Sequence, residues 1–248
     1  MASASRSTLI LITTFLLVFS LHGEEPCSEE VKLLLSPTQV QAAILALQAR
    51  GETHGRIYFY DTPSLALLAK GVILRLREGT EIDITAKLRP LPGEKFVDPS
   101  GGRERWKCEV DLNDGVENPS FSLQTKHVAG KVPETGPQIY QLLSDGQKKL
   151  LEDSKVQIDW KHVKRIAEIQ STSWGTRAQP PFGKLSLELW EWPSGRILEV
   201  STKVTADGGQ STYVGLRDLA NSKGLELSTN QRSKTAIALG KITAAHPQ

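Results

Sequence analysis

The sequence is poor in cysteine and in net charge, and both shortages narrow what the chain can do. Its 248 residues include only two cysteines, Cys27 and Cys108, and the formal net charge is +2. Two cysteines without Cys-x-x-Cys spacing do not make a zinc site. Nearly balanced charge gives the chain as a whole no attraction to nucleic acid or to an anionic membrane. We therefore expect no nucleic-acid partner, and any basic function must come from local clustering of cations.

Several catalytic motifs are also missing. The chain has no Gly-x-Ser-x-Gly elbow, no His-Glu-x-x-His pair and no glycine-rich phosphate loop. His54, His127 and His162 stand alone, so each is interpreted as a surface or loop residue. There are no internal repeats. These absences leave serine-type hydrolysis, zinc-peptidase chemistry and P-loop nucleotide hydrolysis without support.

The only long apolar run lies at the start of the chain, from Leu9 to Leu21, after the single early cation Arg6. It is short for a membrane span, which needs about 20 apolar residues, and it is typical of a secretory signal peptide over residues 1–23. An uncleaved anchor is the alternative. We expect an exported mature chain with no membrane span after cleavage. In an oxidising compartment Cys27 and Cys108 can pair and close a long loop.

Residues 71–90 carry the most informative pattern. Two segments alternate with a period of two and are separated by Glu78-Gly79-Thr80-Glu81, which predicts an antiparallel hairpin. One face of this hairpin would carry four cations: Arg75, Arg77, Lys87 and Arg89. In one interpretation this face is solvated while Leu74, Leu76 and Leu88 lie in the core. In the other the cations line a concavity, which must be wet, lined with carboxylates or occupied by an anion.

The rest of the chain predicts more strands than helices. Strands are expected near residues 29–35, 56–60, 103–112, 121–123, 164–174, 184–192 and 197–204. Helices are expected after Ser36-Pro37 and Asp61-Thr62-Pro63, over 136–153 with a break near Gly146, and over 212–223. Eight to ten strands with few helices predict a closed barrel that is filled or holds one small ligand.

The order of these motifs resembles that of CYTH domains, the triphosphate tunnel metalloenzymes. The resemblance spans Glu30 to about Leu239. It rests on Ser28-x-Glu30-x-Lys32, Tyr58-Phe59-Tyr60-Asp61-Thr62-Pro63, Arg75-x-Arg77, Lys87-x-Arg89, Arg196-Ile-Leu-Glu199, the helix at 212–223, the strand at 225–229 and Arg232-Ser233-Lys234. The resemblance implies an α+β fold: an antiparallel tunnel-like β-barrel over residues 28–242, helices packed outside it, and a frayed tail at 243–248.

The resemblance also implies a site and an activity. The implied phosphate ligands are Lys32, Arg75, Arg77, Lys87, Arg89 and Lys234, with Arg165 or Arg177 as a further one. The implied ligands of Mg²⁺ or Mn²⁺ are Glu30, Glu188 and Glu199, and Glu30 and Lys32 are the implied catalytic residues. The expected partner is a small polyanion. The expected activity is that of an exported, metal-dependent phosphohydrolase acting on inorganic tri- or polyphosphate or on a nucleoside triphosphate.

Two positions depart from the motifs of that family. Ser28 and Ser201 stand where a glutamate is expected, and fewer carboxylates hold a divalent cation less tightly. Glu29 points to the opposite face of an ideal strand and substitutes poorly. A second hypothesis is therefore a module that binds polyphosphate without cleaving it. A third is a barrel that carries apolar ligands, with its arginines facing outward.

Overall fold

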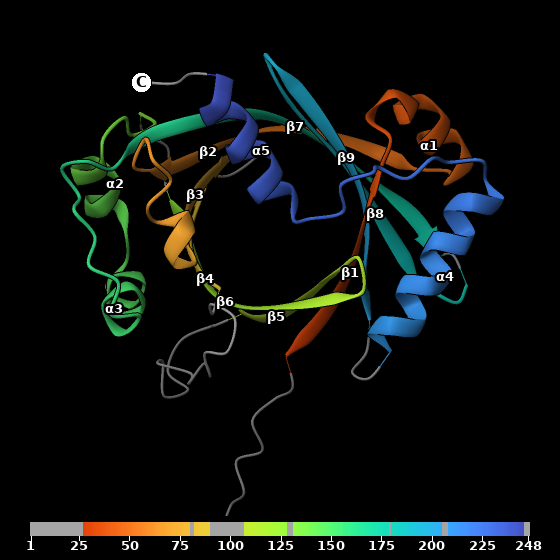
Figure 1. The fold of residues 1–248 in the computed structure, drawn as a ribbon, viewed down its shortest axis with the longest axis horizontal. Helices are drawn as coiled ribbons and strands as arrows, with labels where there is room; N and C mark the ends of the chain where they lie inside the picture. The colour runs from red at the N-terminus through yellow and green to blue at the C-terminus, as the bar shows by residue number, and fades with distance from the viewer. Residues whose placement is uncertain are drawn as a thin grey trace, which may run out of the picture.

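The computed structural model describes residues 27–79, 82–89, 107–127, 131–178, 180–204 and 208–245. Within these residues nine strands close into one barrel in the order β1-β5-β6-β4-β3-β2-β7-β8-β9 (Figure 1). The strands are β1 Ser28–Leu35, β2 Arg50–Asp61, β3 Val72–Glu78, β4 Ile82–Leu88, β5 Lys107–Asn113, β6 Val116–His127, β7 Lys164–Ala178, β8 Lys184–Trp192 and β9 Gly195–Val204. The predicted signal peptide lies outside the described residues.

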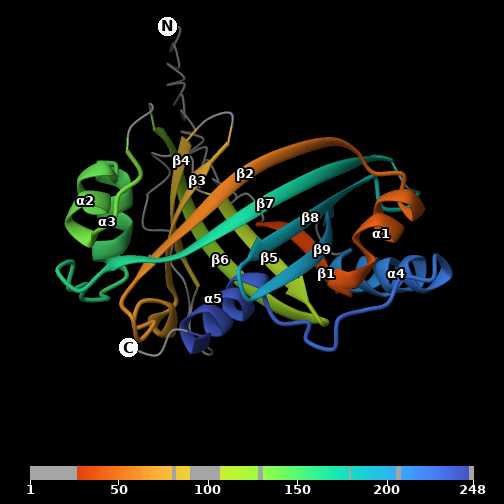
Figure 2. The ribbon, with the colours of Figure 1, turned by 90° about the horizontal axis from the view of Figure 1, so that it is seen from above.

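Helices lie on two opposite sides of the barrel and at its opening. They are α1 Val40–Ala46, α2 Gly136–Leu142, α3 Asp145–Asp153, α4 Gly209–Ser222 and α5 Lys234–Ala245. Figures 1 and 2 show α2 and α3 on one side, α1 and α4 on the other, and α5 across the opening. No helix in the described part of the chain is long and apolar enough to cross a membrane. The predicted α+β class, a barrel with helices packed outside, is confirmed.

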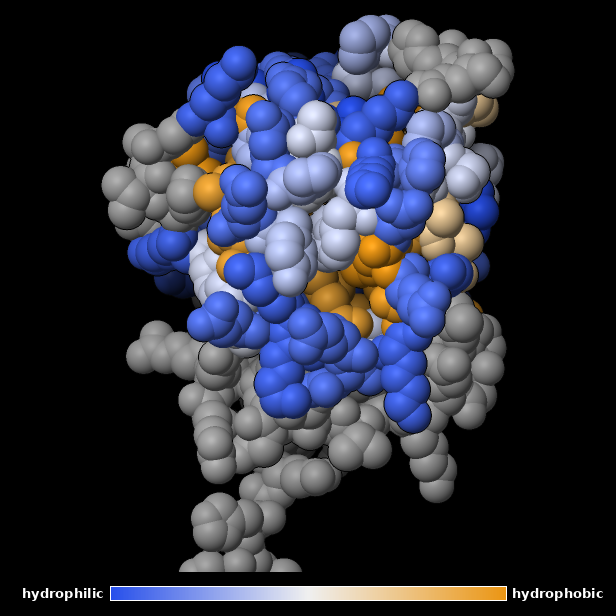
Figure 3. Space-filling view, turned by 90° about the vertical axis from the view of Figure 1, so that its left-hand side faces the viewer, coloured by the Kyte–Doolittle hydropathy of each residue, from blue (hydrophilic) through white to orange (hydrophobic). Residues whose placement is uncertain are grey.

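Two apolar cores hold the outer helices against the barrel wall. Val31, Leu33 and Leu35 of β1 pack against α1 and α4. Leu74 and Leu76 of β3 pack under α2 and α3. Since alternate strand residues point to opposite faces, these contacts direct their sequence neighbours toward the inside of the barrel. Figure 3 shows hydrophilic residues over most of the described surface on the side of α2 and α3.

A third apolar core lies inside the barrel and is closed by α5. It contains Phe59 of β2, Ile73 of β3 and Trp190 of β8, packed with Ile237 and Leu239 of α5. All five side chains are buried. This contact carries the first residue of α5, Lys234, into the barrel. The helix also runs to Ala245, past Ile242, where the tail was expected to begin.

Several predicted elements differ from the structure in their bounds. The break between α2 and α3 falls at Leu143–Ser144, because the Ser144 hydroxyl caps α3; Gly146 lies inside that helix. The helix expected after Asp61-Thr62-Pro63 is only a 3₁₀ turn, Leu68–Lys70. The strand expected at 225–229 is a single bridge between Leu35 and Leu227. Strands β2 and β6 are longer than expected, because β2 starts at Arg50 and β6 starts at Val116.

The barrel closes at a parallel seam, whereas a fully antiparallel barrel was expected. β1 pairs in parallel with β5, from Ser28↔Glu109 to Lys32↔Asn113, while the other neighbours pair antiparallel. A disulfide joins Cys27 to Cys108 at the start of this seam, with their Cα atoms 4.7 Å apart. The hypothesis that the two cysteines pair is confirmed. The disulfide and the seam together fix β5 beside β1.

Candidate functional site

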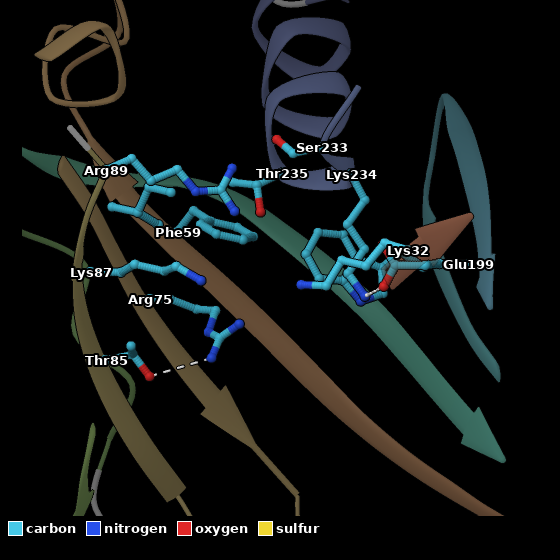
Figure 4. A pocket seen from close by; sticks show the side chains of 12 residues that line it. Lys32, Phe59, Arg75, Thr85, Lys87, Arg89, Glu199, Ser233, Lys234 and Thr235 are labelled. Atoms are coloured by element: carbon cyan, nitrogen blue, oxygen red, sulfur yellow. Dashed lines mark hydrogen bonds and ion pairs between the residues drawn. The ribbon is translucent and has the colours of Figure 1, made fainter. Parts of the chain in front are cut away.

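The cations of the β3–β4 hairpin point into the barrel. Arg75 pairs in register with Thr85, and Ile73 of the inner core pairs with Lys87, so these side chains share the inner face. Figure 4 shows Arg75, Lys87 and Arg89 reaching into one cavity from one side, with Lys32 and Lys234 opposite. The interpretation of a solvated cationic face is wrong, because α2 and α3 cover the other face. An apolar carrier with outward arginines is excluded by the same observation.

The turn before β3 holds Arg89 in place. The backbone N–H of Arg89 donates a 2.7 Å hydrogen bond to the carbonyl oxygen of Gly71. Gly71 has φ +76°, and a Cβ atom there would lie only 2.1 Å from the carbonyl oxygen of Arg89. Only glycine accommodates this conformation and approach.

One buried carboxylate gathers three of the predicted phosphate ligands. Asp111 Oδ1 lies 2.7 Å from Lys32 Nζ, and Asp111 Oδ2 lies 2.6 Å from Arg89 Nη2 and 3.6 Å from Lys87 Nζ. The Asp111 side chain is completely buried. Burial alone would raise its pKa, but the three cations lower the pKa to about 2. We call Lys32, Lys87 and Arg89 the cation cradle.

The sequence interpretation missed Asp111. Val110 and Leu112 lie on one face of its strand, and Glu109 and Asp111 alternate with them on the opposite face. That alternation was visible in the sequence and could have identified both acids. Glu109 Oε2 lies 3.5 Å from Lys87 Nζ, so it also faces the cradle. The inner wall therefore carries its own counter-charges.

A second ionic cluster lies where α5 enters the barrel. Lys234 Nζ donates to Glu199 Oε1 at 2.7 Å and to Glu188 Oε2. Glu188 Oε1 accepts from Ser171 at 2.8 Å and from Arg77 Nη2 at 3.3 Å. Burial opposes the charged forms, but the opposite charges prevail. The carboxylates raise the pKa of Lys234, whereas Lys234 and Arg77 lower the pKa of Glu188.

Arg75 differs from the other inner cations, because it has no acidic partner in the described part of the chain. Among the described residues no carboxylate oxygen lies within 4.0 Å of it, and its one hydrogen bond runs 3.4 Å to Thr85 Oγ1 (Figure 4). Its buried Nε has no partner. Burial and the neighbouring Arg77 lower the pKa of Arg75. The cavity beside it has a volume of about 70 Å³, enough for several water molecules.

Glu30 faces the same interior from β1. Its Oε2 lies 3.1 Å from Lys32 Nζ, and its Oε1 accepts a 3.0 Å hydrogen bond from Ser201. Burial lowers the pKa of Lys32, but the charges of Asp111, Glu199 and Glu30 raise it above its usual value. Ser201, which replaces an expected glutamate, therefore supports Glu30 as a hydrogen-bond donor.

The other residues singled out from the sequence lie elsewhere. Ser28 is exposed, and its hydroxyl donates to the carbonyl oxygen of Cys108 at 3.3 Å. Glu29 Oε2 lies beside Gly209 at the start of α4, on the outer face as expected. Arg165 pairs with Glu134 at 2.9 Å on the side of α2, and Arg177 is exposed. Neither of these arginines enters the cavity.

The predicted metal ligands fit a divalent cation only in part. Glu188 and Glu199 are cross-strand partners, and Glu199 Oε2 is buried without a hydrogen-bond partner. Two such carboxylates suit Mg²⁺, which commonly takes its other ligands from water and substrate phosphate. Within the described residues, however, no group of three or more acidic, histidine or cysteine side chains is placed to hold a metal. The ammonium of Lys234 bridges the two carboxylates instead.

Solved structures of two other proteins, among others, share this fold. HpAC1 from Hippeastrum, proposed as an adenylyl cyclase and described as having a dominant triphosphatase activity, is 18% identical with a TM-score of 0.58; the match covers 86% of this chain and 95% of that one. A proposed adenylate cyclase from Bacillus halodurans is 14% identical with a TM-score of 0.53, over 85% and 96% of the two chains. No family model and no curated protein matches the sequence.

At these identities the likeness shows a shared fold. The fold of this chain matches that of these two structures, so the resemblance to CYTH domains inferred from the motifs is confirmed at the level of the fold. The fold and the interior define a closed α+β barrel whose inner wall carries paired charges.

Proposed function

We propose that this chain is an exported, divalent-metal-dependent phosphohydrolase that cleaves an inorganic tri- or polyphosphate or a nucleoside triphosphate inside its barrel. The observation that carries the proposal is the set of five cationic side chains lining one internal cavity: Lys32, Arg75, Lys87, Arg89 and Lys234. A buried guanidinium without a carboxylate partner, such as Arg75, is stabilised by a bound anion. The triphosphatase activity described for HpAC1, which shares the fold, supports the same function.

The cations would bind and orient the phosphate chain. Arg75 projects from β3 and Lys234 from the start of α5, so they approach the cavity from different sides. Phosphoryl transfer needs little covalent help from a protein, because positioning and charge stabilisation supply most of the acceleration. Water would add to the terminal phosphorus, and the bond from this phosphorus to the bridging oxygen would break. Orthophosphate would keep the water oxygen, and the shortened chain would leave with the bridging oxygen, while the proton lost by the water passes to a phosphate oxygen or to solvent.

Glu188 and Glu199 would hold Mg²⁺ or Mn²⁺, with Glu30 nearby. When bound, the metal neutralises phosphate charge and helps to orient the attacking water. For the two carboxylates to become free, Lys234 must move its ammonium from them to a phosphate oxygen. A bound polyanion would favour this exchange, since it offers Lys234 a more highly charged partner.

Export is supported by the apolar run before Leu21 and by the Cys27–Cys108 disulfide, because disulfides persist mainly in oxidising compartments. N-terminal sequencing of the mature protein would test it. A first residue near Glu24 is expected, whereas an intact Met1 would indicate a retained leader.

Phosphate release from tripolyphosphate with Mg²⁺ or Mn²⁺ tests the activity. We expect release by the wild-type protein and a loss of at least a hundredfold in kcat with Glu199→Gln. Glu168→Gln, which removes the same charge from the outer face of β7, serves as the control. No release with either metal from mildly acidic to alkaline pH would rule out the hydrolase.

A second function is favoured by the ionic bridge at Lys234. Because this ammonium already joins Glu188 and Glu199, the barrel could bind polyphosphate without cleaving it. Metal-independent binding that weakens with salt, together with no phosphate release, would support such a module. Binding that strictly requires Mg²⁺ would contradict it.

A further inference from the structure

Asp111 contacts the cation cradle in the way that an anionic ligand would. Its two oxygens reach all three cations, Lys32, Lys87 and Arg89, at 2.7, 3.6 and 2.6 Å. These cations come from two strands, β1 and β4, and from the residue that follows β4. They converge on one point that the carboxylate of β5 already occupies. Three convergent cations are also what a phosphoryl group, with its three oxygens, requires.

The other two acids at the cradle are held less firmly. Glu30 lies 3.1 Å from Lys32 and Glu109 lies 3.5 Å from Lys87, so each contacts only one of the three cations. The side chains of Glu30 and Glu109 are 22% and 17% exposed, so both can turn toward water when an anion binds. Asp111 has no exposure and sits on a strand fixed by the disulfide seam. It stays in place.

Arg75 offers the contrasting position. It lines the same cavity as the cradle, yet no carboxylate in the described part of the chain lies within 4.0 Å of it. Among the described residues, an incoming anion therefore meets no competing carboxylate at Arg75, whereas at the cradle it meets Asp111.

We propose that Asp111 is an internal anion that takes the place of one phosphoryl group and so limits the length of phosphate chain that the tunnel accepts. The inference rests on the proposed function for the identity of the ligand. Asp111 is on this basis a specificity-determining residue. A chain that binds at Arg75 is stopped at the cradle, where its next phosphoryl group would meet a fixed negative charge.

Calorimetric binding of orthophosphate, pyrophosphate, tripolyphosphate and tetrapolyphosphate, without metal, tests the proposal. In the wild type, affinity should stop rising at a certain chain length. In the Asp111→Asn variant, the affinity should continue to rise for a chain that is one phosphoryl group longer. At that length the variant should bind at least tenfold more tightly than the wild type. Glu109→Gln is the matched control; it removes one negative charge beside the cradle but should give a smaller gain, equal for all chain lengths.

The outcomes are distinct. If Asp111→Asn increases the affinity equally for every chain length, the increase reflects general electrostatics and the proposal is overturned. If Asp111→Asn does not increase the affinity at all, Asp111 has only a structural role and the proposal is likewise overturned. If Asp111→Asn alone does not fold, the double variant Asp111→Asn/Lys87→Met is used, because it removes one charge of each sign. Its binding is then compared with that of Lys87→Met alone. Since only binding is measured, a wild type that binds but does not hydrolyse contradicts the proposed hydrolase and leaves this test intact.

Discussion

Lys234 Nζ donates a 2.7 Å hydrogen bond to Glu199 Oε1, and this contact connects the first residue of α5 to the inner wall of β9. Glu188 of β8 accepts from the same ammonium. The relationship places one ammonium between the two carboxylates that the proposed function assigns to a metal. In the proposed hydrolase, binding of phosphate to Lys234 and binding of a metal to these carboxylates would therefore be coupled.

Lys234→Met should therefore create dependence on a divalent cation. Without the ammonium, two buried carboxylates face each other, and breaking such a buried ion pair costs about 3 kcal/mol of folding free energy. Mn²⁺ should restore part of that loss. Thermal unfolding with and without Mn²⁺, in the absence of any phosphate, measures it. Lys241→Met, at an exposed position of the same helix, is the control. Equal stabilisation of all three proteins by Mn²⁺ would contradict the prediction.

Arg75→Gln should weaken binding of tripolyphosphate about 10- to 100-fold, since a charge-assisted hydrogen bond contributes about 1.5–3 kcal/mol. It should change the stability of the ligand-free protein little, because Arg75 has no acidic partner among the described residues that would be left unpaired. Calorimetry and thermal unfolding separate the two effects. Arg56→Gln removes an outer arginine whose Nε lies 3.0 Å from Glu78, and it should leave binding unchanged. Equal losses of affinity in the two variants would show that only net charge matters.

The hairpin shows how far the sequence alone could lead. Alternation between Leu74, Leu76 and their arginine neighbours predicted the strands and the shared face of the cations, because a strand has a side-chain period of two. It could not tell which face was inner. That depends on α2 and α3 covering the leucines, a contact between segments some 70 residues apart in the chain. The motif order supplied this information only through resemblance to a family.

The ionic partners were harder to predict. Asp111 was identifiable from alternation with Val110 and Leu112, but its pairing with Lys32 depends on the parallel β1–β5 seam, and no local pattern specifies that seam. Likewise, Lys234 reaches Glu188 only because α5 fills the barrel opening. Local periodicity determines faces, whereas long-range packing determines partners, so the candidate ligands were found and their internal counter-charges were not.

The unfolding free energy should decrease as the pH falls from about 4 to about 2. Asp111 has a pKa of about 2 in the folded protein and 3.8 as its ordinary value, so its stabilisation is present above pH 4 and is lost as it becomes protonated. This amounts to about 2 kcal/mol at most. Denaturant unfolding across this range measures it. Asp111→Asn should show a shallower decrease than wild type; parallel curves would assign the acid sensitivity to other groups, Glu188 first among them.

Removal of the disulfide should affect both stability and binding, because the bond closes the barrel at the parallel seam. Cys27 and Cys108 are 81 residues apart, and crosslinks of this kind contribute about 2–4 kcal/mol by restricting the unfolded chain. Cys27→Ser/Cys108→Ser should lose about that much stability.

The seam also carries Glu30 opposite Asp111, the carboxylate proposed to block the cradle, so the double variant should lose part of its discrimination between polyphosphates of different length at a temperature where it is fully folded. Calorimetry below the unfolding transition separates this loss from the loss of stability, and reduction of the wild type should reproduce both. Lost stability with unchanged discrimination would show that β1 and β5 keep the cradle in register through their backbone hydrogen bonds alone.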